Sequence, residues 1–498
     1  MSLNKIIEAE KEIDSDFSIK TNKKKEKKDD DNIIYTSYFE TKDYILEQIL
    51  NTEDTEGSEQ RTGGQKTCFI KYSKLKGEIE KINEIEHEGK LFRPIVDDVF
   101  MKGGVRLPTG VSDYKNTKEI TDQVRQFLKE NIEVPVFYER FLPNLLLFYW
   151  VYEKFPFIPY LGFVGGTGTG KTTAMVDFGS LSYKPIDTTG SLTIASLFRI
   201  ATAWRGTLLI DEFYKVGEHS KEIIAFLKAG VSDRLILRVE GENRKSVNAY
   251  VVKSPKLFTS EQAVSDAGLN SRTLFVNMQK AKKRVPLFKL QDYYEEANEI
   301  RNKLLLWRLR NLNKIDLKKI KYGYDEFREF DGRVQQILTG IYYLSDDKTK
   351  KSILEFAIKQ EEDTKRERKE SISGMVFEIM CEFWDKDADV ELKVVTSMLN
   401  ERRKGSGYKT EFTERKIGSV IRRELGFETE RGGQGGNTFI IRNAEIEENK
   451  RNYFGIDLGT NKKVGPSVIH SDYSVHSDGD AENTLEEEKE MEELNKLF

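Results

Sequence analysis

Short apolar runs alternate with longer segments of mixed polarity through the middle of this chain. The runs at 160–164, 207–210, 256–260 and 273–278 have the length and composition of buried strands. Strands that alternate with helical segments favour an α/β fold, in which a parallel sheet carries helices on both faces. The pattern therefore predicts one such core between residues 136 and 285.

Segments with helical spacing of their apolar residues flank this core. Some precede the first strand, one lies inside the core, and the later ones carry many charges. We expect residues 286–370 to form a helical lid and connector, with a hinge or an exposed turn at 365–370. The expected helices span 117–131, 143–152, 221–229, 292–313 and 325–362.

A pair of strands with a basic turn is predicted late in the core. Alternating apolar residues at 235–239 and 247–252 favour an antiparallel hairpin. The turn between them carries Arg244 and Lys245. A basic tip of this kind suits contact with nucleic-acid phosphates of any sequence, and a plain solvated turn is the alternative.

A separate small domain is predicted at 371–443. A helix over 390–403 is followed by a second that starts after Thr413, a residue type that caps helices well. Short strands on either side of a glycine-rich turn follow. Helix, helix, strand, turn and strand is the order of a winged helix-turn-helix.

This small domain has a local excess of positive charge. Residues 401–431 contain nine basic and six acidic residues. Such an excess suits duplex DNA, with one helix in the major groove and the wing near the backbone. We expect Arg415, Lys416 and Arg422 to contact DNA, and a role in binding proteins is the alternative.

The two ends of the chain show little apolar pattern. A lysine-rich block followed by aspartates at 23–31 favours solvated chain, so we expect residues 1–65 to be disordered. Residues 66–135 contain short β-like pieces and form a small N-terminal region. Residues 444–498 are expected to be a disordered acidic tail.

Composition narrows the class of protein. The 498 residues include 80 basic and 84 acidic ones, which gives a net charge of −4, so any nucleic-acid surface must be local. Two cysteines and four histidines show no metal-ligand spacing and indicate a reducing compartment. The apolar stretch at 141–152 is too short to cross a bilayer. We therefore expect a cytoplasmic protein without a membrane partner.

The most specific motif follows the first predicted core strand. Residues 165–172 are Gly-Gly-Thr-Gly-Thr-Gly-Lys-Thr, a pattern whose glycines let backbone N–H groups surround a phosphate at a helix N-terminus. We expect ATP here, with Lys171 at the β- and γ-phosphates and the Thr172 hydroxyl on Mg²⁺. The expected nucleotide-binding residues in this loop are Gly165, Gly166, Thr167, Gly168, Thr169, Gly170, Lys171, Thr172 and Thr173.

Two acids follow the next buried strand. Asp211 and Glu212 come directly after the apolar run at 207–210. Asp211 is expected to hold the metal, and Glu212 to orient and deprotonate the attacking water. The acid pair favours hydrolysis of ATP over simple binding.

The order of these segments resembles the AAA+ ATPases, specifically the helicase-like ATPases of viral and mobile-element replication proteins, which are related to superfamily 3 and primase-associated helicases. The resemblance covers residues 160–278 and includes 188–199. It implies that Thr259 or Ser260 senses the γ-phosphate, although superfamily 3 helicases usually place Asn there. It also implies that Arg272 is an arginine finger for a neighbouring subunit and that the protein is an oligomer, usually a hexamer. A surface arginine is the alternative for Arg272.

The motifs together predict an ATP-driven DNA helicase or translocase that replicates a virus or mobile element, with single-stranded DNA in a central channel. An ATP-dependent loader or switch without unwinding activity is the alternative, and an NTPase that remodels protein partners is a third class. At the C-terminal end, Leu494, Leu497 and Phe498 loosely match a peptide that binds a sliding clamp. A plain tail is the alternative there.

Overall fold

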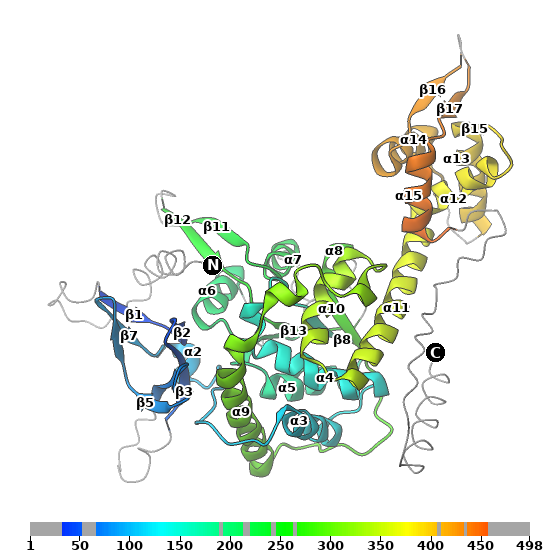
Figure 1. Cartoon of the computed structure of the whole chain (residues 1–498). Helices are drawn as coiled ribbons and strands as arrows, with labels where there is room; N and C mark the ends of the chain where they lie inside the picture. Colours follow the sequence, from blue (N-terminus) through cyan, green and yellow to red (C-terminus); the bar gives the residue numbers. More distant parts are fainter. Residues whose placement is uncertain are drawn as a thin grey trace. The chain divides into compact units, whose positions relative to one another are not determined.

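The computed structural model divides the chain into two compact units, Met1–Glu355 and Phe356–Phe498 (Figure 1). Each unit has its own buried apolar core. The structure describes residues 32–51, 66–188, 193–212, 220–240, 246–261, 266–405, 410–432 and 436–456. In this part of the chain no helix is both long and apolar enough to span a membrane.

A five-stranded sheet forms the centre of the first unit. Every strand pair is parallel, in the order β14-β8-β13-β10-β9, so all carboxyl ends meet at one edge. The prediction of an α/β core with a parallel sheet is confirmed. The strands are β8 (Tyr160–Val164), β9 (Ile186–Asp187), β10 (Leu208–Ile210), β13 (Lys256–Ser260) and β14 (Thr273–Asn277).

Helices cover both faces of this sheet (Figure 1). Leu208 and Phe258 pack with Trp204 and the other apolar residues of the helices α6 and α7 on one face. The helix α5 lies on the other face, where a Cβ on Gly179 would be 2.5 Å from Leu209 Cδ2, so glycine permits this close approach. The helices are α3 (Thr117–Asn131), α4 (Val136–Tyr149), α5 (Lys171–Leu181), α6 (Ile194–Trp204) and α7 (Ser220–Ala229).

The expected hairpin is present beside this core. Strands β11 (Leu235–Glu240) and β12 (Ser246–Val251) pair antiparallel, with Leu237 opposite Ala249. The turn with Arg244 and Lys245 lies outside the described residues. A short helix, α8 (Ala267–Asn270), leads into β14.

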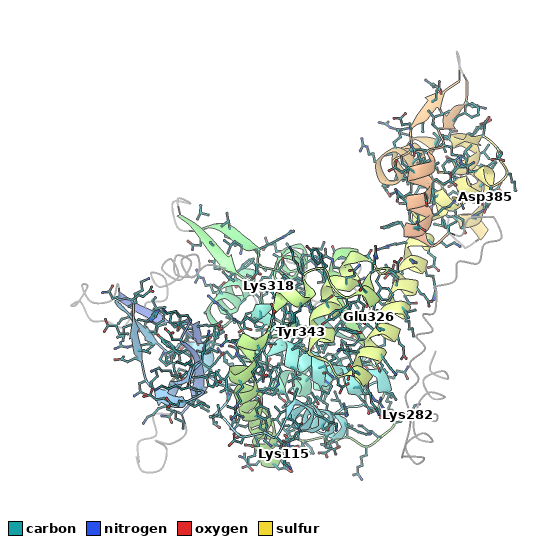
Figure 2. The ribbon with its side chains drawn as sticks, in the orientation of Figure 1. Lys115, Lys282, Lys318, Glu326, Tyr343 and Asp385 are labelled. Atoms are coloured by element: carbon teal, nitrogen blue, oxygen red, sulfur yellow. The ribbon has the colours of Figure 1, made fainter. Side chains whose placement is uncertain are left out.

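A helical part follows the sheet. The N-cap side chain of Asp331 starts α10, and Tyr342 of this helix donates a 3.2 Å hydrogen bond to Glu326. Figure 2 labels Glu326 and Tyr343 among its side chains. The hinge or exposed turn expected at 365–370 is wrong, because these charged residues continue the helix α11. The elements are α9 (Gln291–Asn311), η5 (Leu312–Lys314), η6 (Leu317–Ile320), η7 (Asp325–Phe327), α10 (Gly332–Leu344) and α11 (Asp347–Glu370).

The expectation of disorder over residues 1–65 is wrong for residues 32–51, which form strands. The charged block before them outweighed a strand that is buried on both faces, in which Ile45, Leu46 and Ile49 are fully buried and Glu47 and Gln48 are 1% exposed. Two sheets result, with the orders β1-β7-β6 and β2-β3-β4-β5. Their strands are β1 (Ile33–Tyr35), β2 (Tyr38–Glu40), β3 (Tyr44–Leu50), β4 (Thr67–Ser73), β5 (Ile79–Ile82), β6 (Ile85–His87) and β7 (Lys90–Arg93); the helices α2 (Asp98–Met101) and η2 (Tyr152–Lys154) lie later in the chain.

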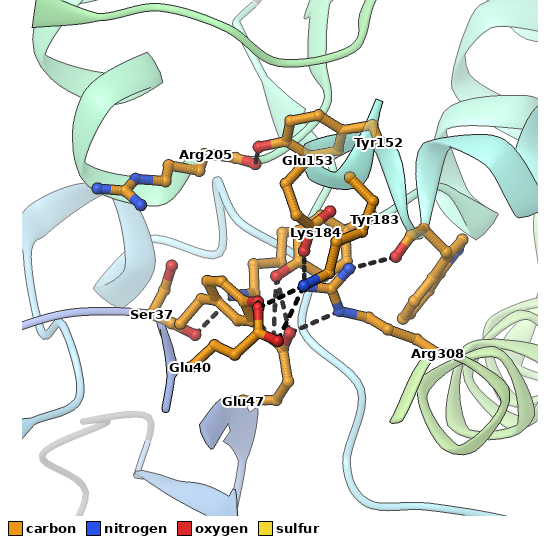
Figure 3. Close-up of polar contacts among 12 residues, drawn as sticks. Ser37, Glu40, Glu47, Tyr152, Glu153, Tyr183, Lys184, Arg205 and Arg308 are labelled. Carbon is orange, nitrogen blue, oxygen red and sulfur yellow. Dashed lines mark hydrogen bonds and ion pairs between the residues drawn. The ribbon is translucent and has the colours of Figure 1, made fainter. Parts of the chain in front are cut away.

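A buried ionic network ties these N-terminal strands to the core (Figure 3). Glu47 on β3 bonds Arg308 of α9 at 2.6 Å and Lys184, after α5, at 3.0 Å. Burial lowers the pKa of Lys184 to about 8, against the opposing effect of Glu47. Arg308 also contacts Glu153, so each buried charge has a partner, which such burial requires. The N-terminal strands are therefore an integral part of the first unit.

The second unit is small and mixed. Phe377, Trp384 and Phe427 centre its core, and Thr413 caps α14 through a 3.3 Å bond from Lys416 N, as expected. Its sheet has the antiparallel order β15-β17-β16. The elements are α12 (Ile372–Trp384), β15 (Val390–Glu391), α13 (Leu392–Gly405), α14 (Glu414–Val420), the π-helical turn η8 (Ile421–Leu425), β16 (Thr429–Arg431), β17 (Thr438–Ile440) and α15 (Ala444–Phe454).

The disordered tail expected from residue 444 is wrong for its first part. Residues Ala444–Phe454 form α15, whose Asn443 N-cap accepts a bond from Ile446 N at 3.1 Å. Phe454 is 3% exposed and belongs to the core of this unit. Arg451 pairs with Glu447 and Asp385, so polar residues that suggested a tail instead satisfy one another.

Candidate functional site

The glycine-rich loop joins β8 to α5 at the carboxyl edge of the sheet. Gly168 and Gly170 have φ of +78° and +82°, left-handed values that residues with a Cβ rarely adopt. Gly170 is also the N-cap of α5 and supplies no side-chain capping bond. The first N–H groups of that helix therefore face the loop, where they suit an anion.

Polar side chains of the loop are directed over its own backbone. Lys171 Nζ donates to the carbonyl of Gly166 at 2.7 Å, and Thr169 Oγ1 donates to the same oxygen at 2.8 Å. Thr173 follows in the first turn and is exposed. The ammonium of Lys171 thus lies at the concave side of the loop, where it can reach a phosphate.

The loop and the acid pair meet in space. Strand β10 ends at Ile210, and Asp211 and Glu212 follow it at the same edge as the loop. Thr172 Oγ1 donates to Asp211 Oδ1 at 3.2 Å. A hydroxyl and a carboxylate this close are the oxygen ligands that Mg²⁺ prefers, so these two residues fit the expected metal.

Thr259 joins the same group from the end of β13. Its hydroxyl contacts Asp211 Oδ1 and accepts a 2.9 Å bond from Glu212 N. Glu212 N also donates to Asp211 Oδ1 at 3.0 Å, and Glu212 has a φ of +47°, which is rare for a residue with a side chain. Strained backbone of this kind is concentrated at functional sites. Ser260, the next residue, is buried, and its carbonyl accepts from Gly165 N at 3.2 Å.

One residue that contacts the glycine-rich loop was not predicted from the sequence. Glu261 Oε1 accepts a 3.3 Å bond from Thr167 Oγ1. Its position directly after the predicted strand at 256–260 could have indicated this contact, because all carboxyl ends of a parallel sheet lie at one edge. Among the described residues, the carboxylates of Asp211, Glu212 and Glu261 directly follow strand ends at this edge.

Arg272 lies at the opposite edge of the sheet from the loop of its own chain. It precedes β14, and its carbonyl accepts a 3.0 Å bond from Tyr160 N at the start of β8. Its guanidinium donates to the Gly268 carbonyl. Burial, and then the charges of Arg333 and Arg234, lower the pKa of Arg272. The structure therefore does not bring Arg272 to the Lys171 loop within one chain.

The basic residues predicted to bind DNA are placed differently. Arg415 and Lys416 are exposed in the first turn of α14 and form no ion pair with a described residue. Arg422 is exposed on η8 and donates to Thr429 Oγ1 at 3.0 Å. These positions leave the cationic groups of α14 open to a phosphate.

The described fold and site define a P-loop-like α/β core. No protein-family model matches the chain, and no curated protein matches it. Solved structures with some likeness include an active helicase, Cch of SCCmec type IV, with 13% identity over 85% of this chain and 80% of its own and a TM-score of 0.39.

Two further solved structures share this limited likeness. The apo C-terminal region of NrS-1, residues 305–718, has 13% identity over 80% of this chain and 96% of its own, with a TM-score of 0.36. Drosophila ORC bound to DNA has 12% identity over 68% of this chain and 94% of its own, with a TM-score of 0.18. Because all these TM-scores are below 0.5, the likenesses do not fix the activity of this chain.

Proposed function

We propose that this chain is an ATP hydrolase that works as a DNA helicase or translocase. The observation that carries the proposal is the meeting of the Lys171–Thr172 loop end with Asp211 and Glu212 at one sheet edge. A phosphate cradle and an acid pair at adjoining strand ends are the parts that hydrolysis of a nucleoside triphosphate needs.

Each residue at this edge has a separate role in the proposed reaction. The loop N–H groups and Lys171 hold the β- and γ-phosphates, while Thr172 and Asp211 hold Mg²⁺, which neutralises phosphate charge when bound. Glu212 orients the attacking water and accepts its proton. Thr259 holds the Glu212 backbone and the Asp211 carboxylate in a fixed relation, and Ser260 supports Gly165.

A second subunit completes the proposed site. Arg272 lies at the amino edge of the sheet and therefore serves the ATP of a neighbour, where its charge stabilises the transferring phosphoryl group. This arrangement requires a homo-oligomer, for which we propose a ring, with a hexamer as the expected number.

DNA is the proposed partner at two places. Arg244 and Lys245, at the hairpin tip, are proposed to hold single-stranded DNA in the channel. The second unit is proposed to bind duplex DNA as a winged helix, through Arg415, Lys416 and Arg422. Such a motor fits replication of a virus or mobile element in the cytoplasm, and a sliding clamp is a proposed partner for residues 491–498.

The test is ATP turnover with and without single- and double-stranded DNA, measured beside strand displacement. The motor predicts turnover stimulated by single-stranded DNA and coupled to unwinding. An ATP-dependent loader, favoured by the exposed basic turn of α14, predicts stimulated turnover without unwinding. Turnover that ignores DNA, with no DNA binding, would exclude both.

A further inference from the structure

The segment that joins β14 to α9 is strongly basic. Residues 279–291 contain five basic residues and no acid, in a chain whose net charge is −4. Two of the five cations are engaged, because Lys289 Nζ pairs with Asp177 at 2.9 Å and Lys283 Nζ donates to the Lys129 carbonyl. The other three are exposed and form no ion pair with a described residue, and one of them, Lys282, is labelled in Figure 2. This part of the surface therefore favours an anionic partner.

The same segment exposes bulky apolar side chains. Leu287, Phe288 and Leu290 are 88%, 77% and 66% exposed. Exposed residues of this size are ordinary when they are scattered singly, but three within four positions form a patch, and such patches mark interaction sites. We call the unpaired cations and these apolar residues together the basic-apolar surface. Its members are Lys280, Lys282, Arg284, Leu287, Phe288 and Leu290.

The backbone beneath the basic-apolar surface is held in place. Lys282 N and Lys283 N both donate to Glu133 Oε2, at 2.9 and 2.8 Å. Farther along, Lys289 Nζ donates to the buried carboxylate of Asp177 on α5 at 2.9 Å. The exposed side chains are therefore presented on a fixed backbone, which lowers the entropy cost of binding a partner.

Acidic residues limit the basic-apolar surface where α9 begins. Asp292, Glu295 and Glu296 lie in the first turns of that helix and are exposed. Burial, and then the charges of Glu130 and Asp292, raise the pKa of Glu296, so negative charge is concentrated there. An anionic partner is attracted to residues 280–284 and repelled from α9, so its charged part lies at the start of the segment.

Two kinds of anionic partner have different chemistry. A nucleic-acid backbone would pair with the cations and stack a base on Phe288, but it offers no apolar group to the aliphatic side chains of Leu287 and Leu290. A peptide that carries both acids and bulky apolar residues matches both parts of the surface. The observations therefore favour a peptide.

This chain contains a segment of that composition. Residues 485–498 carry six glutamates and two lysines. Their apolar residues include Met491, Leu494 and Phe498, at spacings of three and four that align side chains on one side of a bound helix. The segment lies outside the described residues. The 28 residues between it and Ile456 span up to about 95 Å when extended, so the connection does not limit its reach.

We infer that residues 485–498 bind the basic-apolar surface. In both segments the charged residues precede the apolar ones, so the two pair in parallel. The glutamates at 486–488 meet the cations at 280–284, and the apolar residues at 491–498 cover those at 287–290. The contact does not depend on the proposed ATP hydrolysis. The sliding-clamp contact proposed for residues 491–498 uses the same side chains, so the two contacts exclude each other.

The test is site-specific photo-cross-linking in the full-length chain without nucleotide. Leu287→benzoylphenylalanine places a photoreactive group on the surface. Leu75→benzoylphenylalanine, at a residue 93% exposed after β4, is the matched control. Mass spectrometry identifies the cross-linked peptides. Position 287 should cross-link to residues 485–498 with about tenfold higher yield than position 75, because a tethered segment that binds is held at a high effective concentration.

Neutral variants measure the ionic part of the contact. Removing all three unpaired cations should lower the cross-link yield from position 287 by about fivefold, since three exposed ion pairs are lost. Removing three exposed lysines elsewhere should leave the yield unchanged, and thermal unfolding verifies that both variants are folded. The first variant combines Lys280→Gln, Lys282→Gln and Arg284→Gln, and the control combines Lys314→Gln, Lys318→Gln and Lys319→Gln.

Exchanging the charges gives the decisive result. Reversing the three cations to glutamate should abolish the cross-link, because like charges then face each other. Reversing the acids at 486–488 to lysine in the same chain should restore it, which repair of a merely misfolded surface could not do. The first set is Lys280→Glu, Lys282→Glu and Arg284→Glu, and the second is Glu486→Lys, Glu487→Lys and Glu488→Lys.

Three outcomes would overturn the inference. Cross-links from position 287 that map outside residues 485–498, or that are no more frequent than those from position 75, would show that this segment does not bind here. A loss that the second charge reversal does not restore would exclude the ionic pairing. Cross-linking to an added single-stranded oligonucleotide in place of residues 485–498 would assign the surface to nucleic acid. Failure of the proposed function is distinct, because it would appear as absent ATP turnover whatever the cross-link.

Discussion

Thr172 and Asp211, which are 39 residues apart in the sequence, are joined by a hydrogen bond of 3.2 Å between the threonine hydroxyl and a carboxylate oxygen. The bond connects the first turn of α5 to the end of β10, on the far side of β13. It brings two oxygen ligands for Mg²⁺ together, and it is the relationship on which the proposed chemistry depends.

Lys171 and Glu212 should have separable roles in ATP hydrolysis. Lys171→Ala should weaken ATP binding by about 10- to 100-fold, the effect of losing a charged hydrogen bond. Glu212→Gln should bind ATP normally but lower turnover by about 10²- to 10⁴-fold, because the general base is lost. Fluorescent-nucleotide titration and phosphate release measure the two effects, and equal loss of binding in both variants would contradict the role given to Glu212.

Thr259 should act as a positioning residue. Thr259→Val removes the hydroxyl that contacts Asp211 and accepts from Glu212 N. Turnover should fall about tenfold while ATP affinity changes little, since the missing bonds orient the acid pair and do not hold phosphate. Thr259→Ser keeps the hydroxyl and should restore most of kcat; a Ser variant as slow as the Val variant would exclude this role.

Arg272 should complement a defective loop in another subunit. Arg272→Ala alone should lower turnover by about 10³- to 10⁵-fold, the range for an arginine finger. Mixed with Lys171→Ala subunits, it should recover part of the wild-type rate, because an intact loop then meets an intact arginine. Steady-state turnover measured across mixing ratios tests this, and a flat response at every ratio would place Arg272 outside the reaction.

Glu40 should make the stability of the first unit depend on acid pH. Burial by itself raises its pKa, but hydrogen bonds from Lys154, Lys74 and Tyr38 outweigh this and lower it from 4.5 to about 2. A carboxyl group with a lowered pKa stabilises the fold above its unfolded pKa and loses this contribution as pH falls through the folded value.

Glu40→Gln should therefore lower the free energy of unfolding by about 2 kcal/mol at pH 7. The difference from wild type should shrink as the pH falls from 4.5 towards 2. Urea unfolding at a series of pH values measures it. Glu78→Gln, at an exposed carboxylate, is the control and should show no such dependence. A Glu40→Gln difference that does not change with pH would contradict the assignment.

Arg415 and Lys416 should contribute to duplex DNA binding without affecting ATP hydrolysis. Each change to Gln should weaken binding to duplexes of any sequence and lower the slope of log K against log salt by about 1. Lys393→Gln, an exposed lysine on α13, is the control. Fluorescence anisotropy at several salt concentrations measures the effect, and unchanged affinity in the double variant would favour a protein-binding role for this unit.

The sequence alone predicted the features that depend on interactions between residues close together in the chain. Glycines at 165, 166, 168 and 170 followed by Lys171 indicate a loop before a helix whatever the rest of the chain does. Apolar spacing likewise predicted α3 at its observed bounds, because one face of that helix is buried. The capping role of Thr413 is also local, since its hydroxyl bonds the next turn.

Only the tertiary structure decided which distant residues meet. The strand order β14-β8-β13-β10-β9 places Thr259 between the loop and the acid pair. This order could not be predicted from the sequence, because pairing between distant strands depends on the whole sheet. Glu47 and Arg308 are 261 residues apart and became a buried pair only through packing. Charged residues such as these were expected at solvated positions. In the fold they are buried beside a partner of opposite charge and belong to the core.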